Sequence, residues 1–413
     1  MEFDSHKIVK NTSMLYVMNI AKLVLPLISL PYLMRVLSKD CYGSVTFVKS
    51  VMQYMQIFVD FGFMLSASKD IVNAKSDQKK INIIIGEIIL AKIYLIVISF
   101  LALALLVIFI PLLRKYILYT FLSFLVVALT CFTMDFLFKG IEEMQVITYR
   151  FVIMRLIATV LAFVFVKSDS DMLWIPILDI IGSLISIILI VIEMRKRKFF
   201  IVFSGLKQSF IKLKESGVYF LSNMATTAFT ALNTLLTGII LSPSQVADWG
   251  VCLQIVTAIQ SLYTPITDSI YPQMIKTKSY KLIKRIICIF MPFVICGCIL
   301  MFFCSRFVLT LLGGDKYIDA VPIMRCLIPV LLFSFPALLF GWPTLGSINK
   351  AKEVTVTTIV SALVQIVGLF ILILLGMFTP VNIALLRGGV ELILFASRYI
   401  VFYKNRQLFY MSN

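Results

Sequence analysis

The residues of this sequence best suited to chemistry are charged side chains that lie inside long apolar segments. A charge at the centre of a membrane-spanning helix costs about 2.5–3.5 kcal/mol on insertion scales, so such residues are candidates for function. Lys and Arg bind phosphate and other anions, and carboxylates bind protons or cations. The candidates are six cations suited to binding an anionic substrate, Lys22, Lys49, Lys92, Arg150, Arg155 and Arg387, and three carboxylates suited to ion coupling, Asp60, Glu87 and Glu391.

Three of the six cations lie near the middle of their apolar segments, too deep for the side chain to reach water. These are Lys22, Lys92 and Arg155. A charge at this depth faces either a water-filled cavity or an opposite charge. We expect a cavity, which would then be cationic and would attract phosphates; a structural ion pair is the alternative. Arg387 and Glu391 are four residues apart and could pair on one helix face.

Other charged residues lie closer to the ends of the apolar segments. We expect Arg306, Arg325 and Arg398 to extend their side chains to the membrane interface. Asp135 is expected to lie at the interface or to cap a helix end. Asp179, by contrast, lies inside an apolar segment.

Composition places nearly the whole chain in lipid. Of the 413 residues, 60% are hydrophobic and only 14% are charged, and the mean hydropathy is +0.99. A soluble domain carries about 25% charged residues, so soluble folds are excluded. The net charge of +17 does not indicate nucleic acid binding, because no soluble stretch is long enough to form a basic domain. Lys and Arg in cytoplasmic loops explain it.

The sequence contains no metal-site or cofactor motif. Only Cys41 among the eight cysteines lies in a loop, and no Cys-x-x-Cys pair has partners at zinc-site spacing. The single histidine is His6, which excludes histidine-based acid–base chemistry within the membrane. A glycine-rich nucleotide-binding loop is also absent. We therefore expect neither a metal nor a cofactor.

We predict an all-α membrane protein of about twelve transmembrane helices, because a span needs about 20 apolar residues. A basic loop, residues 194–216, divides the chain into an N-terminal six-helix bundle, residues 1–193, and a C-terminal six-helix bundle, residues 217–413. The loop is predicted to lie in the cytoplasm against anionic lipid. The predicted spans are 13–34, 44–66, 80–109, 115–138, 146–166, 172–192, 217–240, 247–270, 285–312, 320–344, 354–376 and 380–403.

The distribution of Lys and Arg predicts the orientation of these spans. When the N-terminus is placed in the cytoplasm, the loops rich in Lys and Arg all fall on the cytoplasmic side, so both termini are predicted to be cytoplasmic. Two six-helix halves that begin on the same side can be related only by a parallel repeat. An aromatic-glycine pair, Tyr42-Gly43 or Trp249-Gly250, precedes the second span of each half.

Several short passages, in order along the chain, resemble the bacterial polysaccharide flippases of the Wzx type. The opening passage is Leu30–Leu37, followed by Tyr42-Gly43 and by Asp60–Phe63. Leu311–Tyr317 leads into the tenth predicted span, and Leu345–Lys350 follows it. Each passage is short, but together they cover essentially the whole chain.

This resemblance implies the multidrug/oligosaccharidyl-lipid/polysaccharide exporter fold, in which two six-helix bundles form a V around a central cavity. It also implies a flippase of the bacterial cytoplasmic (inner) membrane. The implied substrate is an oligosaccharide repeat unit linked to undecaprenyl pyrophosphate, moved by alternating access to the outer leaflet for O-antigen, lipopolysaccharide or other surface polysaccharide. A polysaccharide polymerase and a chain-length regulator are implied as partners.

Three alternatives stay open at this point. A multidrug exporter of the same fold would be expected to place carboxylates rather than lysines at the centre of its cavity. A membrane enzyme of the same pathway, such as a polymerase, would be expected to carry a large outer loop, and the outer loops predicted here are short. A structural scaffold would have no functional use for intramembrane charges.

Overall fold

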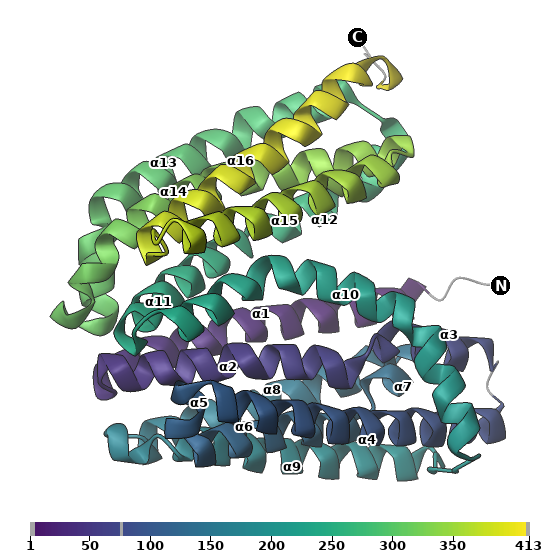
Figure 1. Ribbon diagram of the computed structural model, residues 1–413. Coiled ribbons are helices and arrows are strands. Elements are labelled where there is room, and N and C mark those ends of the chain that lie inside the picture. The colour runs from purple at the N-terminus through teal and green to yellow at the C-terminus, as the bar shows by residue number, and fades with distance from the viewer. Residues whose placement is uncertain (1–4, 75–76, 410–413) are drawn as a thin grey trace. The chain divides into compact units, whose positions relative to one another are not determined.

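The computed structural model describes residues 5–74 and 77–409, and these residues form a helical protein (Figure 1). The first half of the chain contributes ten α-helices that connect through short turns. They are α1 (Ser5–Val36), α2 (Lys39–Asp60), α3 (Phe63–Asn73), α4 (Gln78–Phe109), α5 (Pro111–Lys115), α6 (Ile117–Leu129), α7 (Asp135–Gly140), α8 (Met144–Phe165), α9 (Trp174–Lys196) and α10 (Leu206–Ile240).

The second half contributes six further α-helices and a short π-helix. They are α11 (Pro243–Gln260), α12 (Tyr263–Thr277), α13 (Tyr280–Gly313), α14 (Val321–Leu339), the π-helix η4 (Phe340–Leu345), α15 (Ala351–Leu374) and α16 (Pro380–Lys404). Each of the twelve predicted spans lies on one of these helices or on consecutive ones, which confirms the all-α membrane class.

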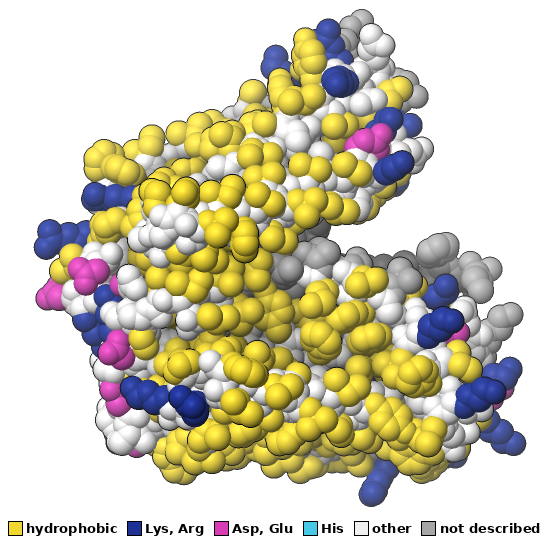
Figure 2. Space-filling view, in the orientation of Figure 1, with side chains coloured by type: hydrophobic (Ala, Val, Ile, Leu, Met, Phe, Trp, Pro, Cys, Tyr) yellow, Lys and Arg dark blue, Asp and Glu magenta, His cyan; other side chains and the backbone are white. Residues whose placement is uncertain are grey.

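The surface of these helices explains why the chain needs lipid around it. Hydrophobic side chains cover the lengths of the helices, whereas Lys and Arg gather at the helix ends (Figure 2). Among the described residues, eight helical stretches are long and apolar enough to cross a membrane. The other four predicted spans, 44–66, 217–240, 247–270 and 380–403, lie on helices with more polar residues. The number twelve fits this arrangement and stays a prediction.

The chain divides into two compact units, residues 1–227 and 228–413. In the first unit α8 packs against α1 and α9, α3 packs against α7, and α6 packs against α2 and α9. In the second unit α14 packs against α11, α13 and α16, and α15 packs against α16. The unit boundary falls within α10, so the basic loop and the beginning of α10 belong to the first unit.

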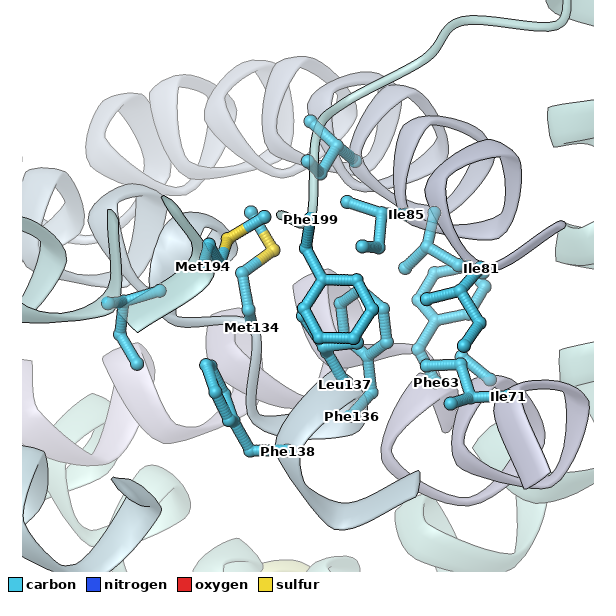
Figure 3. Close-up of a cluster of buried hydrophobic side chains, with 14 of the residues drawn as sticks. Phe63, Ile71, Ile81, Ile85, Met134, Phe136, Leu137, Phe138, Met194 and Phe199 are labelled. Atoms are coloured by element: carbon cyan, nitrogen blue, oxygen red, sulfur yellow. The ribbon is translucent and has the colours of Figure 1, made fainter. Parts of the chain in front are cut away.

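A hydrophobic core holds one end of the first unit together. It joins α3, the beginning of α4, α7 and the end of α9, and Phe63, Ile85 and Leu137 are fully buried in it. Phe199, which belongs to the loop after α9, inserts its ring between Ile85 and Leu137 (Figure 3). The loop is therefore part of the packed unit at this point.

Two of the membrane helices of the first unit are broken. The second predicted span breaks between α2 and α3, where Phe61 has a φ of 40° and Gly62 a φ of 78°. The fourth breaks between α6 and α7, where a 3₁₀ turn is followed by Met134 with a φ of 50°. The corresponding spans of the second half are also interrupted, after α11 and at η4. Irregular backbone at membrane depth is tolerated only where protein covers it or where it borders a cavity.

Candidate functional site

The first unit contains a cavity of about 430 Å³ between its helices, and several charged side chains line it. Its charged lining consists of three cations and three carboxylates, and these residues come from five different helices. They are Lys92 of α4, Arg150 and Arg155 of α8, Asp60 of α2, Asp135 of α7 and Asp179 of α9. Four of these six residues, Lys92, Arg150, Arg155 and Asp60, are among the site residues predicted from the sequence. The structure therefore brings residues far apart in the sequence to one place.

The two helix breaks place two of the carboxylates at the cavity. Asp60 is the last residue of α2, directly before Phe61 and Gly62, and Asp135 is the first residue of α7, directly after Met134. The left-handed backbone at Phe61 and Met134 is uncommon for residues other than glycine. Such conformations cluster at functional sites, where the surrounding structure maintains them. The polar side chain of Thr130, in the 3₁₀ turn, also lines the cavity.

The first ion pair joins α2 and α4 across the cavity. Lys92 Nζ donates a hydrogen bond of 3.1 Å to Asp60 Oδ1, and Gln56 Nε2 donates one of 2.8 Å to Asp60 Oδ2. The Lys92 side chain is 8% exposed, whereas that of Asp60 is 43% exposed. Lys92 is thus held inside the bundle, and Asp60 faces the open part of the cavity.

The second and third ion pairs involve the two arginines of α8. Arg150 Nη2 donates hydrogen bonds of 2.7 and 2.6 Å to the two carboxylate oxygens of Asp135, and Arg150 Nη1 donates one of 3.2 Å to Ser186 Oγ. Arg155 Nη1 donates one of 3.1 Å to Asp179 Oδ1, and the Arg155 side chain is 42% exposed. Arg150 is therefore engaged as a structural group, whereas Arg155 keeps donors free for a ligand.

Lys22 and Lys49 are two further cations near this cavity, although neither lines it. Lys22 Nζ lies 5.4 Å from the centre of the Phe151 ring, which lines the cavity, and its electrostatic neighbours are Asp135 and Arg150. Lys49 has Asp179 and Arg155 as its electrostatic neighbours. Both lysines are exposed, and neither forms an ion pair within the part of the chain that the structure describes.

The charges of this group do not balance. Lys22, Lys49, Lys92, Arg150 and Arg155 carry five positive charges, and Asp60, Asp135 and Asp179 carry three negative ones, which leaves a difference of +2 (5 − 3). In a bundle surrounded by lipid, an excess of positive charge is stabilised by an anion. The arrangement can therefore bind a phosphate-type group without any metal.

Glu87 lies outside the cavity. Its side chain is buried on α4, and its Oε1 accepts a hydrogen bond of 2.7 Å from Ser204 Oγ of the loop after α9. The neighbouring Gly86 allows this contact, because a Cβ atom there would lie 2.1 Å from the carbonyl oxygen of Val202. Glu87 thus joins α4 to the loop.

Arg387 and Glu391 belong to the second unit. Their side chains pair as the spacing predicted, with Arg387 Nη2 3.5 Å from Glu391 Oε2, and both are buried on α16. Arg398, expected at the membrane interface, is instead buried. Its Nη1 donates a hydrogen bond of 2.6 Å to the Ala337 carbonyl beside the break at η4, and its Nη2 donates one of 2.9 Å to Thr358.

Sequence reasoning missed the two carboxylates that pair with the arginines of α8. Asp135, expected at the interface or as a cap, instead pairs with Arg150 inside the bundle, and Asp179 pairs with Arg155. A usable signal was present, since charges buried in a membrane pair with one another. Arg150 and Arg155 each needed a partner, and Asp135 and Asp179 were the unassigned carboxylates within the predicted spans on either side of theirs.

No group of three His, Cys, Asp or Glu side chains among the described residues could hold a metal ion. The eight cysteines are all free, and six of them lie in the second unit: Cys252, Cys288, Cys296, Cys298, Cys304 and Cys326. The chemistry of the site therefore rests on amines, guanidinium groups and carboxylates.

Comparison with known proteins places this cavity in a family context. The family model for polysaccharide biosynthesis proteins matches residues 8–278, which include every charged residue of the cavity. Two relatives, assigned by inference as O-antigen transporters, are each 29% identical to the chain. One, from Shigella dysenteriae, aligns over 275 residues, 66% of this chain and 68% of its own length. The other, from Escherichia coli strain K12, aligns over 286 residues, 68% of each.

Solved structures show the same fold at low sequence identity. The lipid II flippase MurJ in an inward closed conformation superposes with a TM-score of 0.73 at 14% identity, over 96% of this chain and 87% of its own. A multidrug resistance MATE family transporter in an inward-facing conformation gives 0.67 at 12% identity, over 93% and 99%. The fold is therefore that of these transporters. Because the family model covers more than half of the sequence, this chain belongs to the family of polysaccharide biosynthesis proteins.

Proposed function

We propose that this protein is a flippase for lipid-linked oligosaccharides. It moves an oligosaccharide repeat unit, carried on undecaprenyl pyrophosphate, from the inner to the outer leaflet of the bacterial cytoplasmic membrane. The observation that carries the proposal is the cavity of the first unit, which three cations and three carboxylates line, with two further lysines nearby. The names of the O-antigen transporter relatives and the flippase fold support the same substrate class.

The pyrophosphate is the part of this substrate that the cavity fits. Lys22, Lys49 and Arg155 are exposed enough to contact it, and Arg can bind two phosphate oxygens at once. Lys92 and Arg150 are buried and paired, so they contribute to the electrostatic potential without direct contact. The sugars would occupy the aqueous space, and the polyprenyl tail would stay in lipid.

Transport would follow alternating access, in which the site opens to one side of the membrane at a time. The membrane potential favours export of an anion from the cytoplasm, at about 2.3 kcal/mol per charge across 100 mV. A coupled proton or cation would bind at Asp60, because Asp60 alone among the three predicted coupling residues lines the cavity. Glu87 and Glu391 are its alternatives. Both termini are proposed to be cytoplasmic.

Within this proposal the protein is a transporter and not an enzyme, and it needs no cofactor. The polymerase and the chain-length regulator of surface polysaccharide synthesis are its proposed partners. Arg387 belongs to the second unit and is not among the residues that line the cavity of the first. We propose it as a substrate-anion contact of the second unit.

The proposal is tested with purified protein in vesicles that contain a short-chain lipid-pyrophosphate oligosaccharide with a fluorescent sugar. An impermeant quencher outside the vesicles reports the fraction of lipid that has crossed the bilayer. If the protein is a flippase, the labelled oligosaccharide lipid should cross the bilayer only in vesicles that contain the protein. The protein should not accelerate the crossing of a lipid that lacks the pyrophosphate.

A multidrug exporter of the same fold would give the opposite pattern. It would export a cationic dye and leave the oligosaccharide lipid in place, and this result would contradict the proposal. A polymerase would lengthen the oligosaccharide, which chromatography of the recovered lipid detects.

A further inference from the structure

The loop after α9 and the first turns of α10 form one continuous surface segment, residues 197–214, which we call the linker. Its backbone is fixed along α4. The Phe200 amide donates a hydrogen bond of 3.0 Å to Asn82 Oδ1, the Val202 amide donates one of 3.3 Å to the Asn82 carbonyl, and Gln78 Nε2 donates one of 2.8 Å to the Lys198 carbonyl. The linker is therefore an ordered surface of the first unit.

The first turns of α10 have one face toward the unit. Ser209 and Ser216 are fully buried on this face, Ser216 Oγ lies 2.6 Å from Ser66 Oγ, and Lys212 Nζ donates a hydrogen bond of 2.7 Å to Asp70. These residues recur every three or four positions, which is the spacing of one helix face. The opposite face of the same turns is consequently directed away from the unit.

Large apolar side chains are exposed on the outer side of the linker. Phe210 is 71% exposed and Phe203 is 61% exposed, although both belong to a segment that also buries Phe199 in the core. Contiguous exposed apolar patches mark a binding surface for protein or membrane. The complete set is Phe200, Ile201, Val202, Phe203, Leu206, Phe210 and Ile211.

Cations are interleaved with these apolar residues. Lys198, Lys207 and Lys214 are exposed, and none of them takes part in an ion pair among the described residues. Lys207 and Lys214 lie on the outer face of α10, beside Phe210 and Ile211. No Asp or Glu occurs between Lys198 and Lys214. The exposed surface therefore combines apolar side chains with positive charge alone.

We infer that the linker is a docking surface for the acidic phospholipids of the membrane. Its apolar residues would enter the boundary between headgroups and acyl chains, and Lys198, Lys207 and Lys214 would contact the phosphates. A basic segment with exposed aromatic and aliphatic residues is typical of peptides that lie in the membrane interface. The inference does not depend on the proposed substrate.

Lipid is a better match for this surface than a protein partner. The linker begins directly after α9 and packs against the beginning of α4, and both helices are apolar enough to cross a membrane. It is thus held at the level where a membrane helix ends. Lysine is also depleted in protein–protein interfaces, and the linker exposes Lys198, Lys207 and Lys214 among its apolar residues.

The test uses the full-length protein in vesicles of brominated phosphatidylcholine to which brominated or unlabelled phosphatidylglycerol is added. Phe210→Trp provides a fluorescent probe on the linker, and Phe303→Trp, at a 73% exposed site on α13, provides a matched probe on an apolar membrane helix. The signal of each probe is the difference from the parent protein, which contains Trp174, Trp249 and Trp342.

We expect brominated phosphatidylglycerol to quench the probe at residue 210 at least twofold more per molecule than brominated phosphatidylcholine. At residue 303 the two lipids should quench equally. The triple change Lys198→Gln, Lys207→Gln and Lys214→Gln should abolish the preference at residue 210. The matched triple change Lys276→Gln, Lys281→Gln and Lys284→Gln removes the same charge from the second unit and should leave it intact.

Two outcomes would overturn the inference. Equal quenching by both lipids at residue 210 would show contact with lipid but no selection of the acidic headgroup. An absence of quenching at residue 210, with normal quenching at residue 303, would show that the linker does not lie in lipid and would direct attention to a protein partner. Monodisperse elution of each variant would confirm that it is folded.

Discussion

The ammonium group of Lys92 lies 3.1 Å from the carboxylate of Asp60 and joins α4 to the end of α2. The two partners differ in their environment, because the lysine is almost completely enclosed and the aspartate is nearly half exposed to the cavity. Removing a partner from a buried pair is costly mainly when it leaves a buried charge without compensation. The two residues of this pair therefore have unequal effects on stability.

We expect Asp60→Ala to lower the free energy of unfolding by about 3 kcal/mol, because it leaves the Lys92 ammonium enclosed and unpaired. Lys92→Met should cost only about 1 kcal/mol, because the exposed Asp60 is solvated by the cavity. Unfolding of the purified protein in mixed micelles measures both values, and the double variant should recover part of the loss. Equal costs for the two single changes would contradict this assignment.

The cavity cations should separate into binding and structural groups. Lys22→Gln and Lys49→Gln are each expected to weaken binding of a short-chain prenyl pyrophosphate by about 10- to 100-fold, because a charge-assisted hydrogen bond contributes about 1.5–3 kcal/mol. Their stability should change by less than about 0.5 kcal/mol, because both lysines are exposed. Thermophoresis gives the binding and thermal unfolding gives the stability.

Arg150→Gln is the structural counterpart of these two lysine variants. The guanidinium group of Arg150 is buried and bonded to Asp135 and Ser186, so its removal should lower the free energy of unfolding by about 3–5 kcal/mol and reduce the yield of folded protein. A fully stable Arg150→Gln protein with lost binding would show that Arg150, and not Lys22 or Lys49, is the direct ligand.

Two glycines in long membrane helices provide a test of the linker's position. A Cβ atom at Gly86 of α4 would lie 2.1 Å from the Val202 carbonyl oxygen, whereas one at Gly297 of α13 would meet no atom within 4 Å. Gly86→Ala should displace the linker and break the hydrogen bond between Ser204 and Glu87. The backbone amides of residues 199–205 should then exchange faster. Gly297→Ala should stabilise its helix by about 0.5–1 kcal/mol. Unchanged exchange in the Gly86 variant would contradict the close contact.

The Lys212–Asp70 pair should be insensitive to pH in the neutral range. Burial disfavours the charged amine, but the hydrogen bonds that Lys212 donates to Asp70 and Glu215 outweigh this effect and raise the pKa of Lys212 above its ordinary value of 10.5. A raised lysine pKa stabilises the folded state fully below pH 10.5 and loses that contribution only as pH rises through the folded pKa.

Lys212→Gln is accordingly expected to cost about 0.5–1 kcal/mol, with the same cost at pH 6 and at pH 9. Thermal unfolding of both proteins at the two pH values checks this expectation. A cost that is present at pH 6 and absent at pH 9 would show that the amine titrates below its ordinary value.

The sequence predicted much of the fold because hydropathy is a one-dimensional property. Each predicted span lies on described helices, and Lys92, Arg150, Arg155 and Asp60 line the cavity because a charge in an apolar segment is visible without a structure. The helix breaks of the first unit were not predicted. Phe61, Gly62 and Met134 interrupt the backbone without interrupting the apolar pattern, so hydropathy is continuous across them.

The ion pairs between residues far apart in the sequence could be found only from the three-dimensional structure. Lys92 and Asp60 are 32 positions apart, and Arg155 and Asp179 are 24 apart, so no helical spacing connects them. Arg387 and Glu391 could be paired from the sequence because they are one turn apart on α16. Arg398 was expected at the interface because it lies near the end of its span, but it instead bonds to the Ala337 carbonyl beside the break at η4.

The central claim is that the excess cations of the first unit bind the pyrophosphate of a lipid-linked oligosaccharide during flipping. The most direct measurement compares transbilayer movement of that lipid in vesicles with the parent protein, with the double variant Lys22→Gln and Lys49→Gln, and with a charge-matched control, Lys281→Gln and Lys284→Gln, outside the cavity. We predict a loss of at least tenfold in the initial rate for the cavity variant and an unchanged rate for the control. Equal rates in all three proteins would contradict the claim.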